Sequence, residues 1–260
     1  MRVLLSHDDL GRWAPGHDHM MDSEALALAY AYPQLSSEQT WVRANFVSTL
    51  DGAATGDDGR SGSINTGADR DVFVLLRALS DVVLVGAGTA RTEGYRRATV
   101  RTPWLNLRRG RPAHPTTAVF SRSGDVPHGL SQAREDSGEV LLVTCEDAGA
   151  AAIDLARAML GQENVIVAGG ESVDLPAALD ALARRGLRRI LCEGGPHLMG
   201  DLAASGRLDE LCLTIAPTLV GGDHPRIAAG PAMAANLLPR LLIESQGSIL
   251  GRWTRPDPHT

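Results

Sequence analysis

The chain has 260 residues, of which 43% are hydrophobic and 22% charged, values typical of a globular protein with one large domain or two small ones. Its formal net charge of −6 argues against a general nucleic-acid-binding protein, because binding to phosphates requires a basic surface. No apolar run approaches the roughly 18–20 residues that span a bilayer, and the first residues are too polar and acidic for a signal peptide. We therefore expect a cytoplasmic protein that binds neither membranes nor nucleic acid.

The cysteines carry no sign of a metal site. Cys145, Cys192 and Cys212 each stand alone within an apolar run, without the spacing of metal ligands. Buried free thiols in a reducing compartment are the expected interpretation, and no metal is predicted.

The N-terminal part of the chain predicts a helix and a strand. Residues 1–38 are expected to form a mainly helical appendage to a domain over 39–260. A helix is predicted around residues 21–33, with Asp22 or Ser23 as its N-cap and Pro33 as its end. The β-branched and aromatic stretch 40–50 predicts a strand. Asp51 follows it, either holding the turn or facing a ligand, and the turn role is favoured.

A helix is predicted over residues 68–80, after a loop rich in glycine, aspartate and serine. Its apolar positions recur at i, i+3, i+4 and i+7 and give one buried stripe of Val72, Leu75, Leu76 and Leu79. Three other side chains, four residues apart, run along an adjoining edge: Asp69, Phe73 and Arg77.

Strands and helices then alternate. Buried strands are predicted at 81–89, 116–121, 139–145, 164–170, 188–195 and 210–217, with helices at 148–160 and 174–185 between them. Asp174 would cap the second helix and Gly186 would end it. This alternation predicts an α/β fold with a mostly parallel sheet flanked by helices. The last segment, 241–253, alternates around a glycine and predicts an antiparallel hairpin at the sheet edge.

Two strand ends share a glycine turn, in residues 83–94 and 191–202. Ligands of α/β sheets bind outside the carboxyl ends of the strands, and the free N–H groups of a helix start favour anions such as a diphosphate. A glycine turn is also ordinary connection chemistry, and Arg91 interrupts the G-x-G-x-x-G fingerprint. The glycines alone leave both interpretations open.

A carboxylate follows the second buried strand directly. Glu193 is costly there unless it meets solvent, a cation or a ligand hydroxyl, and a salt bridge to a nearby arginine would also satisfy it. Arg77 likewise is either a lid on the core or a clamp for a phosphate.

Three separated stretches, 42–55, 64–95 and 191–222, resemble in order the reductase domain of riboflavin biosynthesis. That domain is the C-terminal half of bifunctional deaminase–reductase proteins and has a dihydrofolate-reductase-like fold. The resemblance covers roughly residues 40–255. No H-x-E paired with P-C-x-x-C is found, so the zinc deaminase half is missing and we expect a stand-alone reductase.

The resemblance implies a reaction. Members of the family use NADPH to reduce a substrate of the 5-amino-6-(5-phosphoribosylamino)uracil type to its ribitylamino product. Hydride goes to C1′ of the open-chain ribose imine. The protein would therefore supply positioning, a polar contact to the ribose hydroxyls and a phosphate clamp.

The resemblance also implies site residues. Glu193 falls on the catalytic position, in contact with the substrate ribose. Substrate-binding positions fall on Ser61, Asp69, Arg77, Arg96 and Asn45. Cofactor-binding positions fall on Gly86, Gly88, Thr89, Glu93, Ser121, Arg122, Gly194, Gly195, Pro196, His197, Leu198 and Met199.

The sequence departs from the family pattern at several positions. Asn45 stands where many members have lysine, Ser63 where some have tryptophan, and Glu93-Gly94-Tyr95 where Asp-Asp-Pro is usual. Asp69 lies near the position of the pterin-binding carboxylate of dihydrofolate reductases, although a helix N-cap is the preferred interpretation.

Two alternatives therefore stay open beside the leading function. One is a reductase of another heterocycle such as dihydrofolate, and the other is a flavin- or nucleotide-binding protein without activity. A homodimer is expected from the family and from the apolar edge of the C-terminal hairpin.

Overall fold

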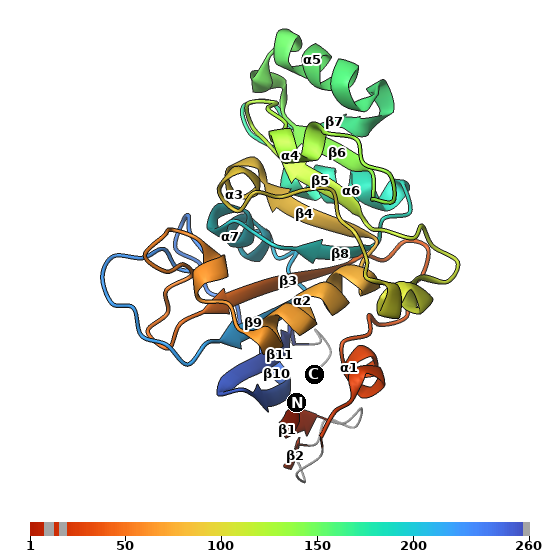
Figure 1. Cartoon of the computed structure of the whole chain (residues 1–260). Coiled ribbons are helices and arrows are strands. Elements are labelled where there is room, and N and C mark those ends of the chain that lie inside the picture. Colours follow the sequence, from red (N-terminus) through yellow and green to blue (C-terminus); the bar gives the residue numbers. More distant parts are fainter. Residues whose placement is uncertain (8–12, 16–19, 257–260) are drawn as a thin grey trace.

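The structure is a computed structural model that describes residues 1–7, 13–15 and 20–256. These residues form one eleven-stranded sheet in the order β2-β1-β10-β11-β9-β3-β8-β4-β5-β6-β7 (Figure 1). Seven adjacent strands are parallel: β3 (Trp41–Ser48), β4 (Val82–Gly86), β5 (Thr116–Phe120), β6 (Val140–Thr144), β7 (Val165–Val167), β8 (Arg189–Cys192) and β9 (Glu210–Ile215). The predicted α/β class with a mostly parallel sheet is confirmed.

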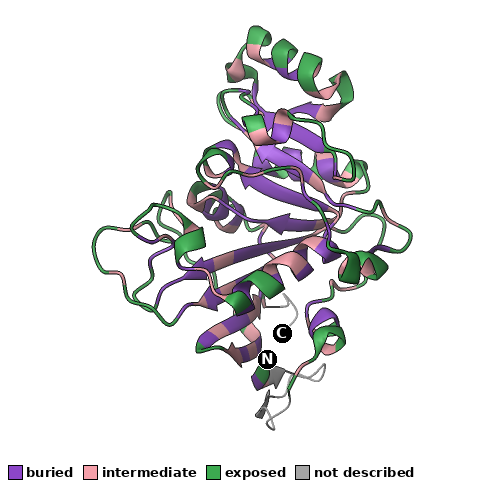
Figure 2. Cartoon of the chain, in the orientation of Figure 1, coloured by how far each residue is buried: buried purple, intermediate pink, exposed green. Residues whose placement is uncertain are grey.

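Helices cover both faces of this sheet. Alternate residues of β4 show the division, because Val82 and Leu84 pack against one set of helices and Val83 and Val85 against another. The strands are accordingly buried while the helices expose their outer sides (Figure 2). On the first face lie α6 (Leu175–Arg184) and α7 (Pro196–Ala204); on the second lie α1 (Ser23–Ala29), α2 (Gly67–Leu79), α3 (Ala87–Thr92), α4 (His128–Ser131) and α5 (Ala150–Leu160).

The helix caps confirm two predictions and correct a third. Asp22 caps α1 and Asp174 caps α6, each accepting a hydrogen bond from a backbone N–H of the first turn. The interpretation of Asp69 as an N-cap is wrong. Thr66 is the N-cap of α2, and its hydroxyl accepts from the backbone N–H of Asp69. The Asp69 side chain is thereby free to turn inward, where it is buried.

The C-terminal hairpin is antiparallel as predicted, but its place at the sheet edge is wrong. It consists of β10 (Leu238–Ser245) and β11 (Ser248–Thr254). Strand β1 (Arg2–His7) pairs with β10, and β2 (Trp13–Pro15) pairs with β1, so β2 is the edge strand of the described sheet. The expected helical appendage thus differs from the structure, since the described part of residues 1–38 supplies two strands besides one seven-residue helix.

A buried ion cluster joins the N-terminal segment to the sheet. We use this name for Arg43 of β3, Glu210 of β9 and Arg252 of β11. Glu210 Oε1 lies 2.9 Å from Arg43 Nε and 2.6 Å from Arg252 Nε, and the Arg43 and Glu210 side chains are 0% exposed. The same arginines donate to the last carbonyls of the α1 region, Arg43 to Tyr30 and Arg252 to Ala29. These bonds fix α1 over the antiparallel half of the sheet.

Two smaller expectations can also be compared with the structure. All three cysteines are free and buried, as predicted. Among residues 1–7, 13–15 and 20–256, every helix is too short or too polar to cross a lipid bilayer.

Candidate active site

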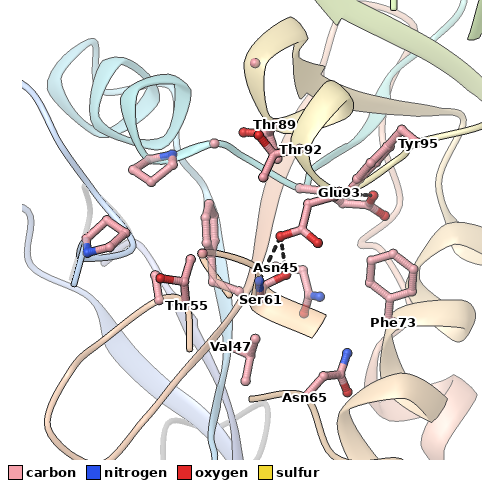
Figure 3. A pocket seen from close by; sticks show the side chains of 18 of the residues that line it. Asn45, Val47, Thr55, Ser61, Asn65, Phe73, Thr89, Thr92, Glu93 and Tyr95 are labelled. Carbon is pink, nitrogen blue, oxygen red and sulfur yellow. Dashed lines mark hydrogen bonds between the residues drawn. The ribbon is translucent and has the colours of Figure 1, made fainter. Parts of the chain in front are cut away.

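A cavity of about 370 Å³ opens beyond the carboxyl ends of β3, β4 and β8, and we call it the main cavity. The first turns of α2 supply Asp69 and Phe73 to its wall, and α3 supplies Gly88 and Thr89. In Figure 3, Asn65 and Phe73 lie on one side of this cavity, with Thr89 and Thr92 across from them. Because its lining is largely apolar with a few converging polar groups, it has the character of a ligand site.

A second, larger depression of about 890 Å³, which we call the outer groove, runs along the same sheet edge. It passes over the start of α7 and the segment that follows β5, where Ser121 and Arg122 lie. The two depressions share a wall made of Gly88, Thr89, Gly195 and Pro196. Ligands in the two would therefore lie next to each other.

The two glycine turns meet at this shared wall. The N–H of Gly86 donates to the carbonyl of Gly194 at 2.7 Å. A Cβ on Gly195 would lie 2.2 Å from Thr89 Oγ1, and Gly194 has a φ of +94° that side chains disfavour. The glycines are thus required first by the contact between the turns themselves. The Gly194–Gly195 peptide bond is cis.

Glu193 is held by two partners from other elements. Its two carboxylate oxygens accept from Arg77 Nε and Nη2, each at 2.7 Å, and the Tyr95 hydroxyl donates to Oε2 at 2.8 Å. The Glu193 side chain is 2% exposed and that of Arg77 18%. Burial raises the Tyr95 pKa, and the Glu193 charge raises it further, so this hydroxyl stays protonated.

The salt bridge to arginine, one of the two sequence interpretations of Glu193, is therefore present. Glu193 and Tyr95 also line the main cavity. Arg77 lines neither depression, and its guanidinium lies 4.3 Å from the centre of the Phe73 ring. Arg77 therefore contacts two residues that line the main cavity, Glu193 and Phe73, without lining it itself.

A second polar link crosses the main cavity. Glu93 Oε1 accepts from the backbone N–H of Ser61 at 2.8 Å and from its hydroxyl at 3.0 Å, as the dashed lines in Figure 3 show. This link ties the loop after β3 to the end of α3. Glu93, expected to contact the cofactor, lines the main cavity and not the outer groove.

Three polar side chains complete the opposite wall of the main cavity: Asn45, Asn65 and Asp69. Asp69 is 3% exposed and Asn45 8%. Within the described part of the chain, Asp69 Oδ1 and Asn65 Oδ1 have no hydrogen-bond partner. Burial raises the Asp69 pKa, and a hydrogen bond with Thr214 and the charge of Arg70 only partly oppose this.

The remaining sequence-predicted residues divide between the groove and other places. His197 and Leu198 line the outer groove together with Ser121 and Arg122, whereas Met199 packs in the core. Arg96 is exposed and lines neither depression. Asp51 holds its turn as favoured, accepting from the Thr49 hydroxyl and from the backbone N–H of Gly221.

Sequence reasoning missed several cavity residues. Tyr95 was noted only as a departure from a motif, yet its hydroxyl would have needed a partner once buried. Asn65 directly precedes the N-cap of α2 and gave no periodic signal. The others come from loops and strand ends whose convergence no local pattern shows: Phe46, Val47, Ala54, Thr55, Gly59, Thr92 and Pro225.

The family model described as the RibD C-terminal domain matches residues 40–246. The chain belongs to this family. A 2,5-diamino-6-ribosylamino-4(3H)-pyrimidinone 5′-phosphate reductase from Archaeoglobus fulgidus is 29% identical over 194 residues, which cover 73% of this chain and 86% of the relative.

Two solved structures have a similar fold. A pyrimidine reductase-like protein from Corynebacterium diphtheriae superposes with a TM-score of 0.77 at 26% identity, covering 89% of this chain and 98% of that one. A diaminohydroxyphosphoribosylaminopyrimidine deaminase/5-amino-6-(5-phosphoribosylamino)uracil reductase from Thermotoga maritima gives 0.60 at 20% identity, covering 84% of this chain and 57% of that protein. The second likeness bears on the fold alone.

Proposed function

We propose that the protein is an NADPH-dependent reductase of a ribosylamino-pyrimidine 5′-phosphate in riboflavin biosynthesis. The observation that carries this proposal is the shared wall of Gly88, Thr89, Gly195 and Pro196 between two ligand-sized depressions. Hydride transfer requires a donor and an acceptor in contact, and this arrangement supports one ligand on each side of that wall. Membership of the RibD C-terminal domain family supports the same chemistry.

The outer groove fits a dinucleotide. Gly195 is the N-cap of α7 and its cap has no side-chain hydrogen bond, so the first N–H groups of this nine-residue helix are available to a diphosphate. Ser121 and the exposed Arg122 would hold the 2′-phosphate that distinguishes NADPH from NADH. When bound, the cofactor supplies the hydride.

The residues of the main cavity would position the substrate. We place the ribose near Glu193, whose charge is balanced by Arg77 and whose orientation is fixed by two hydrogen bonds from that arginine and one from Tyr95. As hydride adds to C1′ of the open-chain imine, the imine nitrogen takes up one proton from solvent. The chain thus contributes orientation more than proton transfer.

Absorbance at 340 nm tests the proposal. Oxidation of NADPH that depends on a ribosylamino-pyrimidine phosphate supports it. Much faster oxidation with dihydrofolate would instead favour the other heterocycle. Binding of NADPH without oxidation, with pyrimidine and pterin candidates alike, would favour a binding protein without activity.

Arg122→Ala tests the cofactor site. We expect the Kd of NADPH to rise about 10- to 100-fold, because a charge-assisted contact to the 2′-phosphate is lost, while the Kd of NADH stays unchanged. Fluorescence titration with both cofactors measures this. Arg134→Ala is the matched control, since Arg134 is exposed and lies outside the outer groove. An equal rise in the Kd values of NADH and NADPH in Arg122→Ala would show that Arg122 does not bind the 2′-phosphate.

The homodimer stays a prediction, and one of its two reasons is withdrawn. The hairpin of β10 and β11 is not an open edge, because β1 covers it. Family membership remains as support. Sedimentation of a 27.5 kDa particle at micromolar concentration would contradict the dimer.

A further inference from the structure

A third depression lies at the amino ends of β4 and β8, and we call it the basic pocket. Its volume is about 450 Å³, and it is lined by three arginines, Arg109, Arg111 and Arg189, and by apolar side chains that include Leu79 and Leu107. Arg189 begins β8 and the carboxylate of the main cavity directly follows that strand, so roughly 13 Å of extended chain separate the two sites. The proposed reaction makes no use of this pocket.

The positive charge around the basic pocket is only partly balanced by the protein. No carboxylate among the described residues lines it. Asp81, which lies beside it, has Oδ1 3.1 Å from Arg111 Nη1 and 3.7 Å from Arg189 Nη1, so two guanidinium groups share one carboxylate. Arg109 is exposed and its side chain has no partner in the part of the chain that the structure describes.

A fourth guanidinium group lies beside the pocket. Arg108 is 3% exposed and donates to the carbonyls of Ala78, Ser80 and Pro112, none of which carries a full negative charge. Burial lowers the Arg108 pKa, and the positive charge of Arg111 lowers it further. This concentration of positive charge stands in a chain whose formal net charge is −6.

Part of this charge has a structural role. Arg108 and Arg111 donate to carbonyls at the C-terminal end of α2, where cations stabilise a helix. The bond from Arg111 to the Leu79 carbonyl, at 2.8 Å, also holds that guanidinium in place, and the side chain is 17% exposed. Capping does not account for Arg109 and Arg189, whose guanidinium groups donate to no helix carbonyl among the described residues.

Two cations with unused donors beside an apolar wall fit a phosphate monoester. A phosphate monoester carries nearly two negative charges at pH 7, and its oxygens accept hydrogen bonds from planar guanidinium groups. A carboxylate brings only one charge to the same pair of cations. Leu79 and Leu107 would contact an apolar or aromatic group attached to the phosphate.

We propose that the basic pocket binds a small phosphate monoester with an apolar or aromatic group, at a site separate from the cofactor and the substrate. Arg109 and Arg189 bind the phosphate oxygens, and Arg111, held by the end of α2, completes the positive wall. Binding here does not require the reductase function, so it can be tested without turnover.

Calorimetry with phenyl phosphate, with and without saturating NADPH, tests the proposal. Arg109→Gln and Arg189→Gln should each raise the Kd of phenyl phosphate about 10- to 100-fold, because each removes a hydrogen bond between two charged groups. NADPH should leave this Kd unchanged. Inorganic phosphate lacks the apolar group and benzoate lacks the second charge, so we expect each to bind at least about 10-fold more weakly than phenyl phosphate.

The control separates this pocket from the remaining surface charge. Arg134→Gln changes an exposed arginine outside the basic pocket and should alter neither the Tm nor the Kd of phenyl phosphate. Arg109→Gln should also keep the wild-type Tm, since Arg109 has no partner to lose among the described residues.

Four outcomes would overturn the proposal. They are no binding of phenyl phosphate, the same Kd in wild type and Arg109→Gln, binding of inorganic phosphate or benzoate as tight as that of phenyl phosphate, and loss of phenyl phosphate binding when NADPH is added. The last outcome would place the phosphate in the cofactor site. Each result leaves the proposed reductase function to its own test.

Discussion

Glu210→Gln should lower the Tm by roughly 10 °C. The change removes the only negative charge of the buried ion cluster as we defined it and leaves the guanidinium groups of Arg43 and Arg252 facing a neutral amide. Loss of one partner from a buried pair costs about 3–5 kcal/mol, and about 1 kcal/mol moves the Tm of a chain of this size by roughly 2–4 °C. Thermal unfolding followed by circular dichroism measures the shift.

The control for this variant is Glu244→Gln. Glu244 of β10 forms a salt bridge with Arg2, in which the two side chains are 28% and 48% exposed. Exposed pairs contribute about 0–1 kcal/mol, so this variant should keep the wild-type Tm within a few degrees. Equal shifts in the two variants would show that burial of the cluster is not what stabilises the fold.

The carboxylate of Glu210 also predicts that the stability of the fold depends on pH. Burial by itself would raise the Glu210 pKa, but Arg43 and Arg252 outweigh it and hold the pKa below its ordinary value of 4.5. Because the pKa is lower in the folded chain, the stabilisation is complete above pH 4.5 and is lost as the pH falls through the folded pKa. The difference in unfolding free energy between wild type and Glu210→Gln should therefore narrow in acid. A constant difference down to pH 2 would contradict the assignment.

Glu193→Gln should reduce both stability and activity. Arg77 loses its charged partner, which we expect to lower the Tm by several degrees. If Glu193 positions the ribose, kcat/KM corrected for the folded fraction should also fall about 10- to 100-fold, the value of a hydrogen bond to a charged group. Thermal unfolding and steady-state kinetics on one preparation separate the two effects.

Tyr95→Phe tests how much the hydrogen bond from the Tyr95 hydroxyl contributes, for comparison with Glu193→Gln. It removes one hydrogen bond to Glu193 Oε2 and leaves the ion pair with Arg77 in place. A hydrogen bond to a charged group contributes about 1.5–3 kcal/mol, so the loss of stability should be smaller than in Glu193→Gln. A destabilised Glu193→Gln with unchanged corrected kcat/KM would remove Glu193 from the site and leave it as a structural partner of Arg77.

Local patterns were enough to predict most of the fold. The buried runs at 81–89 and 139–145 predicted strands, which the structure places at Val82–Gly86 and Val140–Thr144. Asp174 and Gly186 predicted the start and the end of a helix, and α6 lies between them. The hairpin was misplaced at the edge because its partner, β1, lies more than 200 residues away in sequence. Asp69 was misassigned because Thr66 was an equally suitable cap one turn earlier.

The candidate site was less accessible to sequence reasoning. The two glycine turns and Glu193 could be found because their chemistry is local. The choice between ligand and salt bridge for Glu193 depended on where Arg77 and Tyr95, 116 and 98 residues away, place their side chains. Such convergence is a property of the tertiary structure, and only the resemblance could anticipate part of it.

The hydrogen bonds between the α1 region and the buried ion cluster show that the folded unit is larger than the region matched by the family model. The family match covers residues 40–246, so the region that the family model matches excludes β1, α1 and β11. Recombination that moved only residues 40–246 would deprive Arg43 of the Tyr30 carbonyl and would leave β10 without both of its neighbours, β1 and β11. Unpaired strand edges invite association with other chains. A fragment that is meant to fold without open strand edges must therefore include the N-terminal segment and β11 besides the matched region.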